Sequence, residues 1–177
     1  MKRTTLHAAL ALVGTVALIV VGVAGGAATK KGKPKLSATP VFKLHLKPSQ
    51  EVPPIKDLRA DAVGSVTFDL ERSSAGTITA GEVIFYFNYA FPGSVNINGL
   101  HIHQGAKGAN GPIVVSSGVA AFTDADGEGN ITTVVAGTAP ATLQAILDNS
   151  RSYYVNLHTS VNPGGALREQ MHNPKKR

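Results

Sequence analysis

The sequence predicts an all-β protein, an antiparallel β-sandwich with one short helix. Three observations lead to this prediction. Most of the chain beyond residue 40 alternates between apolar and polar residues, turn-forming residues recur at intervals of roughly ten residues, and a single segment has helical periodicity. The 177 residues suit one domain with terminal appendages. A core of that size is stable without disulfides, and the chain has no cysteine.

The first three predicted strands are separated by turn residues. Every second residue is apolar in residues 41–47 and again in residues 63–70, as in strands with one buried face. Residues 73–76 form a turn. Residues 81–90 are apolar on both faces, which is typical of a central strand.

The second half of the domain holds the helix and the remaining strands. The strands are predicted at residues 100–103, 112–122, 129–136, 153–159 and 166–171. The sequence Asp-Ala-Asp-Gly at 124–127 predicts a hairpin turn, because it lacks the distal glutamate of a calcium loop. Thr138 is the predicted helix N-cap and Pro140 lies in the first turn. The helix is expected to end at residues 149–150.

The charge distribution argues against a nucleic-acid partner. The formal net charge is +6, but nine of the 17 basic residues lie in the two ends of the chain. Residues 36–174 carry eight basic and 11 acidic residues. The predicted domain is therefore mildly acidic, and a high pI produced by the ends predicts no DNA or RNA interface.

The N-terminal segment predicts export. Residues 1–28 combine a basic start, a long apolar run and small residues at the end, as in a secretory signal peptide cleaved after Ala28 or an uncleaved membrane anchor. Residues 29–40 are rich in Lys, Pro and Gly and are predicted to be a linker. We expect a secreted or envelope-associated domain that contacts the membrane only through an uncleaved anchor.

Several separated motifs occur in a fixed order along the predicted domain. They are residues 49–54 (SQEVPP), 100–105 (LHIHQG), 108–114 (GANGPIV), 154–159 (YVNLHT) and 162–165 (NPGG), followed by Arg168. This pattern resembles the CHRD domain, a module named after chordin that also occurs in bacterial secreted proteins. The resemblance assigns residues 41–172 to the domain and 173–177 to a basic tail.

The resemblance implies a β-sandwich, an extracellular location and no established catalytic activity. In chordin, growth-factor binding is associated with separate cysteine-rich modules, and this chain has no cysteine. The family usually has Glu-Ile-Arg-Gly-Gln after Pro-Gly-Gly, whereas residues 166–170 here read Ala-Leu-Arg-Glu-Gln. We expect a non-catalytic binding or structural module with an extracellular protein or an envelope component as its partner.

The histidines predict an alternative function as a copper- or zinc-binding protein. His101 and His103 are two residues apart, so on a strand their imidazoles share one face. His158 lies on the polar face of its own predicted strand and joins them if the two strands are neighbours. Imidazole nitrogen suits both Cu and Zn. Structural polar packing is the competing explanation. His45 is predicted to take no part, and His172 is an outside candidate for a fourth ligand.

The His-x-His pattern resembles the copper site of Cu/Zn superoxide dismutases at the level of the fold, which would allow superoxide-related chemistry. The sandwich could thus be of the Greek-key, immunoglobulin-like or superoxide dismutase-like type. We expect Glu51, Asn156 and Arg168 to be structural or binding residues, with Glu51 either paired with Arg168 or exposed in a turn. No hydrolase or phosphate-binding motif occurs, so the sequence does not predict an enzyme.

Overall fold

The computed structural model describes residues 39–176, without the side chains of residues 175 and 176. The predicted signal or anchor at residues 1–28 and most of the predicted linker lie outside the described residues. No helix in the described part of the chain is both long and apolar enough to cross a membrane.

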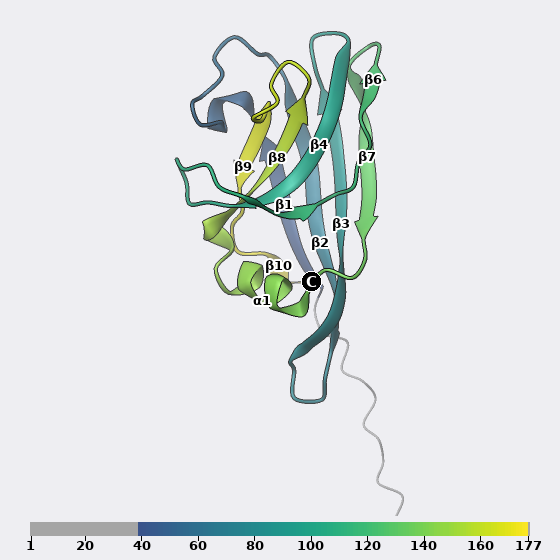
Figure 1. The fold of residues 1–177 in the computed structure, drawn as a ribbon, viewed down its shortest axis with the longest axis vertical. Coiled ribbons are helices and arrows are strands. Elements are labelled where there is room, and N and C mark those ends of the chain that lie inside the picture. The colour runs from purple at the N-terminus through teal and green to yellow at the C-terminus, as the bar shows by residue number, and fades with distance from the viewer. Residues whose placement is uncertain (1–38, 177) are drawn as a thin grey trace, which may run out of the picture. The chain divides into compact units, whose positions relative to one another are not determined.

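The domain consists of two antiparallel sheets packed face to face (Figure 1). The first has the order β10-β1-β2-β3-β7, with bounds Lys175–Lys176, Pro40–Leu46, Asp61–Arg72, Ile78–Ala90 and Glu128–Val135. The second has the order β5-β4-β8-β9, with bounds Ile113–Ser116, Val95–Gln104, Tyr153–Thr159 and Leu167–Gln170, and β6 (Phe122–Asp124) also pairs with β4. This arrangement confirms the predicted all-β sandwich.

The core lies between the two sheets and is built from alternating residues of each strand. The largest fully buried apolar side chains are Phe42, Phe68, Phe85, Phe87, Leu46, Ile97, Leu100, Ile102, Leu143 and Ile146. Complete burial of one such side chain stabilises the fold by about 1.5–3 kcal/mol. The alternation that predicts the strands therefore also selects the residues that hold the two sheets together.

The short helix α1 (Pro140–Asp148) buries Leu143 and Ile146 and packs against β3. It begins with Pro140 and is followed by Asn149, as predicted. The predicted cap at Thr138 is wrong, because Ala139 is the N-cap and no side chain caps the helix. Pro140 has no N–H group and a fixed φ, so the first turn needs less capping. Two 3₁₀ helices, η1 (Pro48–Gln50) and η2 (Ser150–Ser152), complete the elements.

Two further predictions are wrong between residues 112 and 128. The single predicted strand at 112–122 is two short strands, β5 and β6. The predicted hairpin turn at 124–127 is a connection between sheets, because β6 pairs with β4 while β7 pairs with β3. Turn residues indicate that the chain changes direction, but they do not specify which strand the next segment joins.

Strand β8 is buried on both faces, although its Tyr154, Asn156 and His158 were predicted to face outward. These side chains do point away from the core, but loops cover them. Loop 105–111 and loop 162–165 contact this face through hydrogen bonds, and loop 51–54 is tied to the first of these by the bond from Asn110 Nδ2 to the Val52 carbonyl (2.7 Å). The covered outer face of the second sheet is where the candidate site lies.

Candidate metal centre

The register of β4 and β8 brings the three predicted histidines together. His101 and His103 share one face of β4, and His158 on β8 is paired with Gly99 of β4. One imidazole nitrogen from each histidine lies within 4.8 Å of the others. Within residues 39–176, these three form the only group of at least three metal-ligating side chains that is so compact. The other two described histidines bond elsewhere: half-exposed His45 to Asp61, and exposed His172 to the Gln170 carbonyl.

The imidazoles of His103 and His158 point their Nε2 atoms at each other, and each Nε2 carries a lone pair. His103 Nδ1 is 3.0 Å from the Gly111 carbonyl oxygen, and His158 Nδ1 is 3.0 Å from that of Pro163. A carbonyl oxygen only accepts, so each Nδ1 is the protonated, donating nitrogen. The two Nε2 atoms, 3.3 Å apart, are then both acceptors. This arrangement is unfavourable unless a cation lies between them.

A metal ion fits this pair better than an additional proton does. Burial lowers the pKa of the His103 and His158 imidazoles, which keeps both rings neutral at physiological pH. Neutral imidazole is the form that binds metal. Metal-bound histidines typically donate their second nitrogen to a backbone carbonyl, as both rings do here. The backbone bonds thus leave the ligating nitrogens free.

His101 supplies the third imidazole and contains an orphaned buried nitrogen. Its Nδ1 is buried without a hydrogen-bond partner. Burial and, to a smaller extent, His158 and His103 lower the pKa of His101 to about 4. Native structures rarely leave a buried polar atom unpaired, and such an atom needs an explanation. A shared metal ion explains both this unpaired atom and the opposed lone pairs of the other two rings.

Gly99 provides the space for the His101 ring. A Cβ atom at position 99 would lie 2.7 Å from His101 Cε1 and 3.2 Å from Nε2. We expect Gly99→Ala to push the ring away and to weaken metal binding by about 10- to 100-fold, with a change in stability of less than about 1 kcal/mol. Metal titration and urea unfolding of the variant measure the two effects. Unchanged metal affinity would contradict this role of Gly99.

Next to the histidines lies a second buried polar layer, formed by Glu51, Asn156 and Arg168. Asn156 is paired with His101 on one side and with Arg168 on the other. Asn156 Nδ2 donates to Glu51 Oε2 at 3.5 Å. Neither alternative predicted for Glu51 is correct: it is buried, with 5% of its surface exposed, and it forms no ion pair with Arg168, because none of their N–O distances is 4.0 Å or less. The two charges interact at longer range. Loop 51–54 places the carboxyl above Asn156, beyond direct reach of the guanidinium.

Burial raises the pKa of Glu51 to about 7, although Arg168 and the Asn156 hydrogen bond oppose this. The folded protein therefore holds a proton that the unfolded chain releases between about pH 4.5 and 7, so Glu51 lowers stability as the pH rises through this window. We expect Glu51→Gln to gain about 1–3 kcal/mol of stability relative to wild type between pH 4.5 and 8. The histidine contributions are common to both proteins and cancel. Urea unfolding at both pH values tests this expectation, and a difference that does not change with pH would contradict it.

Sequence reasoning missed the residues that orient the histidines. Tyr154 stacks on His103 with 4.8 Å between ring centroids and 9° between the planes, and its hydroxyl accepts from the Gly111 N–H. Gly111 and Pro163 supply the carbonyls that fix the rings. The position of Tyr154 four residues before His158 was visible in the sequence, but the loop contacts were not.

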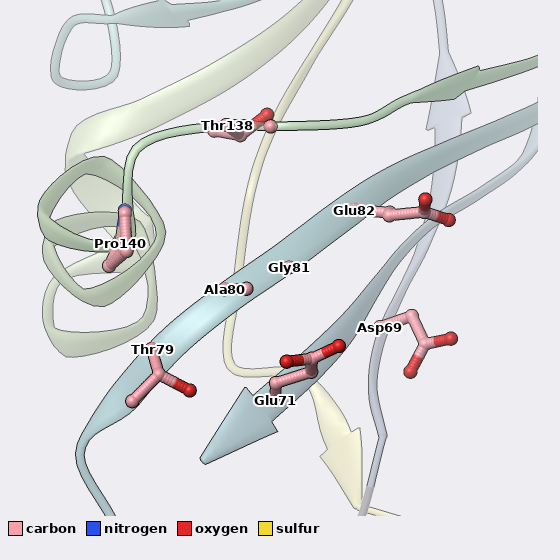
Figure 2. Close-up of a pocket in the computed structure, with 9 residues that line it drawn as sticks. Asp69, Glu71, Thr79, Ala80, Gly81, Glu82, Thr138 and Pro140 are labelled. Carbon is pink, nitrogen blue, oxygen red and sulfur yellow. The ribbon is translucent and has the colours of Figure 1, made fainter. Parts of the chain in front are cut away.

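An acidic cavity on the outer face of the first sheet is a separate feature. Figure 2 shows the carboxylates of Asp69, Glu71 and Glu82 on β2 and β3. Thr138, just before α1, and Pro140, the first residue of α1, line the same cavity. Among the described residues, these three carboxylates do not form a compact group of metal-ligating side chains. The histidine cluster on the opposite outer face is therefore the candidate metal centre.

Comparison with known proteins agrees with the fold and with the motifs. The family model described as the CHRD domain matches residues 42–171. No curated protein and no solved structure matches the chain. The matched region contains all three histidines, the residues that orient them, and every strand except β10 and the first two residues of β1. Because this match covers well over half of the chain, the chain belongs to the CHRD domain family.

Proposed function

We propose that this chain is a secreted or surface-anchored CHRD-domain protein whose domain binds one copper or zinc ion through His101, His103 and His158. The observation that carries the proposal is the pair of opposed Nε2 lone pairs, 3.3 Å apart, on two rings whose other nitrogens are bound to backbone carbonyls. Export is supported by the basic and then apolar N-terminal sequence.

The ligand chemistry narrows the choice of metal. The site offers three neutral nitrogen donors, and the compact group contains no carboxylate. Calcium and magnesium bind oxygen ligands, whereas imidazole suits zinc and copper. The chain has no cysteine that could compete as a ligand. When bound, the ion would act as a Lewis acid or a redox centre, and the chain's own residues would hold and orient the three rings.

The alternative is that the three rings are only polar packing in an extracellular binding or structural module. In that case one ring would carry a proton between the two Nε2 atoms. Burial opposes this, because it lowers the pKa of every ring in the cluster. An extracellular or envelope partner is compatible with either function, since a metal site can also stabilise a binding module.

Metal titration of the full chain, purified without a polyhistidine tag, tests the proposal. We expect one equivalent of Cu²⁺ or Zn²⁺ to bind saturably to wild type, and His103→Ala to lose at least about 100-fold in affinity. His45→Ala is the matched control, because His45 is half exposed and bonds to Asp61 outside the cluster. Absence of a saturable site in wild type, or equal losses in the two variants, would reject the proposal.

A further inference from the structure

We propose that Arg168, which holds a fixed positive charge behind the ring of Tyr154, shifts the ion preference of the histidine site toward copper(I) and away from divalent ions. This inference rests on the proposed function and concerns how the site discriminates between ions of different charge. It assigns Arg168 a role as a positioning residue that acts on the metal through Tyr154 and does not touch it.

The charge, the aromatic ring and the ligand form a stack across three adjacent strands. The Arg168 guanidinium carbon lies 3.5 Å from the centroid of the Tyr154 ring, and that ring is stacked on His103. Strands β9 and β4 flank β8 on opposite sides, so Tyr154 lies between the guanidinium and the imidazole. The positive charge therefore faces the metal centre across a single ring.

Arg168 cannot move away from this position. It is one of the most completely buried large side chains in the domain, with 2% of its surface exposed. It donates to Asn110 Oδ1 at 2.9 Å, to the Ala109 carbonyl at 2.8 Å and to the Ala106 carbonyl at 3.4 Å. All three acceptors belong to loop 105–111, which also carries Gly111. The guanidinium thus fixes the loop and is fixed by it.

The charge of Arg168 is not neutralised by direct contact. Its three hydrogen-bond acceptors are neutral, and none of the described carboxylates lies within 4.0 Å of its nitrogens. Glu51 interacts with it only at longer range. Guanidinium remains protonated at any physiological pH. A permanent positive charge is therefore buried one aromatic ring away from His103, the nearest of the three neutral ligands.

This arrangement discriminates between ions by their charge. The repulsion between Arg168 and a bound ion is twice as large for a divalent as for a monovalent ion at the same position. Little screening by water is expected, since His103 and His158 are 7% and 8% exposed. Among the metals that imidazole favours, copper is the one with a stable monovalent state. Removal of the charge should therefore favour Cu(II) over Cu(I).

The test measures the affinities for Cu(I) and Cu(II) separately, by competition with chromophoric chelators at pH 8. We expect Arg168→Gln to lower the ratio of Cu(I) to Cu(II) affinity by at least about tenfold, which corresponds to 59 mV in a one-electron potential. Arg168→Lys should weaken both affinities through loss of the guanidinium fork, but keep the ratio within about threefold of wild type. Lys107→Gln is the charge-matched control on the same loop, with an exposed side chain, and should leave the ratio unchanged.

Glu51→Gln supplies an independent arm that does not disturb the stack. At pH 8 it removes the negative charge that partly offsets Arg168, so the ratio of Cu(I) to Cu(II) affinity should rise. If Arg168→Gln does not fold, the affinity ratio of Glu51→Gln tests the inference by itself. An unchanged ratio in folded Arg168→Gln, or in Glu51→Gln, would overturn the inference while leaving metal binding intact. Wild-type protein that binds neither copper ion nor zinc would instead overturn the proposed function.

Discussion

Metal at about 1,000 times its Kd is expected to raise the free energy of unfolding of the wild-type protein by about 4 kcal/mol. The reason is that the ion binds the folded state and not the unfolded chain. His103 and His158 are separated by 55 positions, and only the pairing of β4 with β8 brings their rings together. Urea unfolding at pH 7.5, with and without Zn²⁺, measures the effect as a shift in midpoint at constant slope.

The same experiment distinguishes the cluster from other histidines. We expect His158→Ala to abolish the stabilisation by zinc, while His172→Ala retains it, because the His172 side chain is exposed and bonds to the Gln170 carbonyl. A zinc-induced shift of equal size in His158→Ala would contradict the assignment of His158 as a ligand.

The metal affinity should also depend weakly on pH. A histidine with an ordinary pKa of about 6.5 loses metal to protons below that pH. Burial lowers the pKa of all three rings, to about 4 for His101, so protons compete only at lower pH. We therefore expect the affinity to change little between pH 7.5 and 6.5. A steep loss in that range would indicate protonated rings in the folded protein.

We expect Gly111→Ala to cause a large loss of both stability and metal affinity. A Cβ atom at position 111 would lie 1.6 Å from the Gln104 carbonyl oxygen, so backbone would have to move. The Gly111 N–H donates to the Tyr154 hydroxyl and its carbonyl accepts from His103 Nδ1. We expect a loss of more than about 3 kcal/mol in stability and a loss of at least about 10-fold in metal affinity.

Gly164→Ala is the control for this substitution. Gly164 lies in the loop that covers His158, and a Cβ atom there would meet nothing within 4 Å. The unfolding midpoint and the metal affinity of the Gly164→Ala protein should stay close to those of wild type. Wild-type stability in Gly111→Ala would show that the loop tolerates the displacement and does not hold His103 in place.

Local patterns in the sequence predicted most of the strands correctly, since alternation along a strand depends only on which residues face the core. Residues 153–159 were predicted with the bounds that β8 has in the structure. The errors occur where the outcome depends on contacts distant in sequence. The turn at 124–127 connects two sheets, and the helix begins at Pro140 without the Thr138 cap. Neither outcome follows from the residues in those segments.

For the candidate site, too, local sequence patterns predicted one part and contacts between distant segments decided the rest. The shared face of His101 and His103 follows from the two-residue period of a strand and could be predicted from the sequence. The approach of His158 requires the register of β4 and β8, which pairs it with Gly99. The covering of the outer face of β8 by three loops also could not be predicted, because an alternating strand has the same sequence pattern whether its polar face is open or covered.

The sequence by itself determined the sandwich class, the family and the identity of the three histidines, because these depend on residue types and on short-range periodicity. Only the tertiary structure decided that their rings meet, which nitrogen of His103 and of His158 is free, and that Arg168 lies behind Tyr154. These features depend on strand register and loop packing. Both are set by the free energy of the whole domain, so segments far apart along the chain are positioned together.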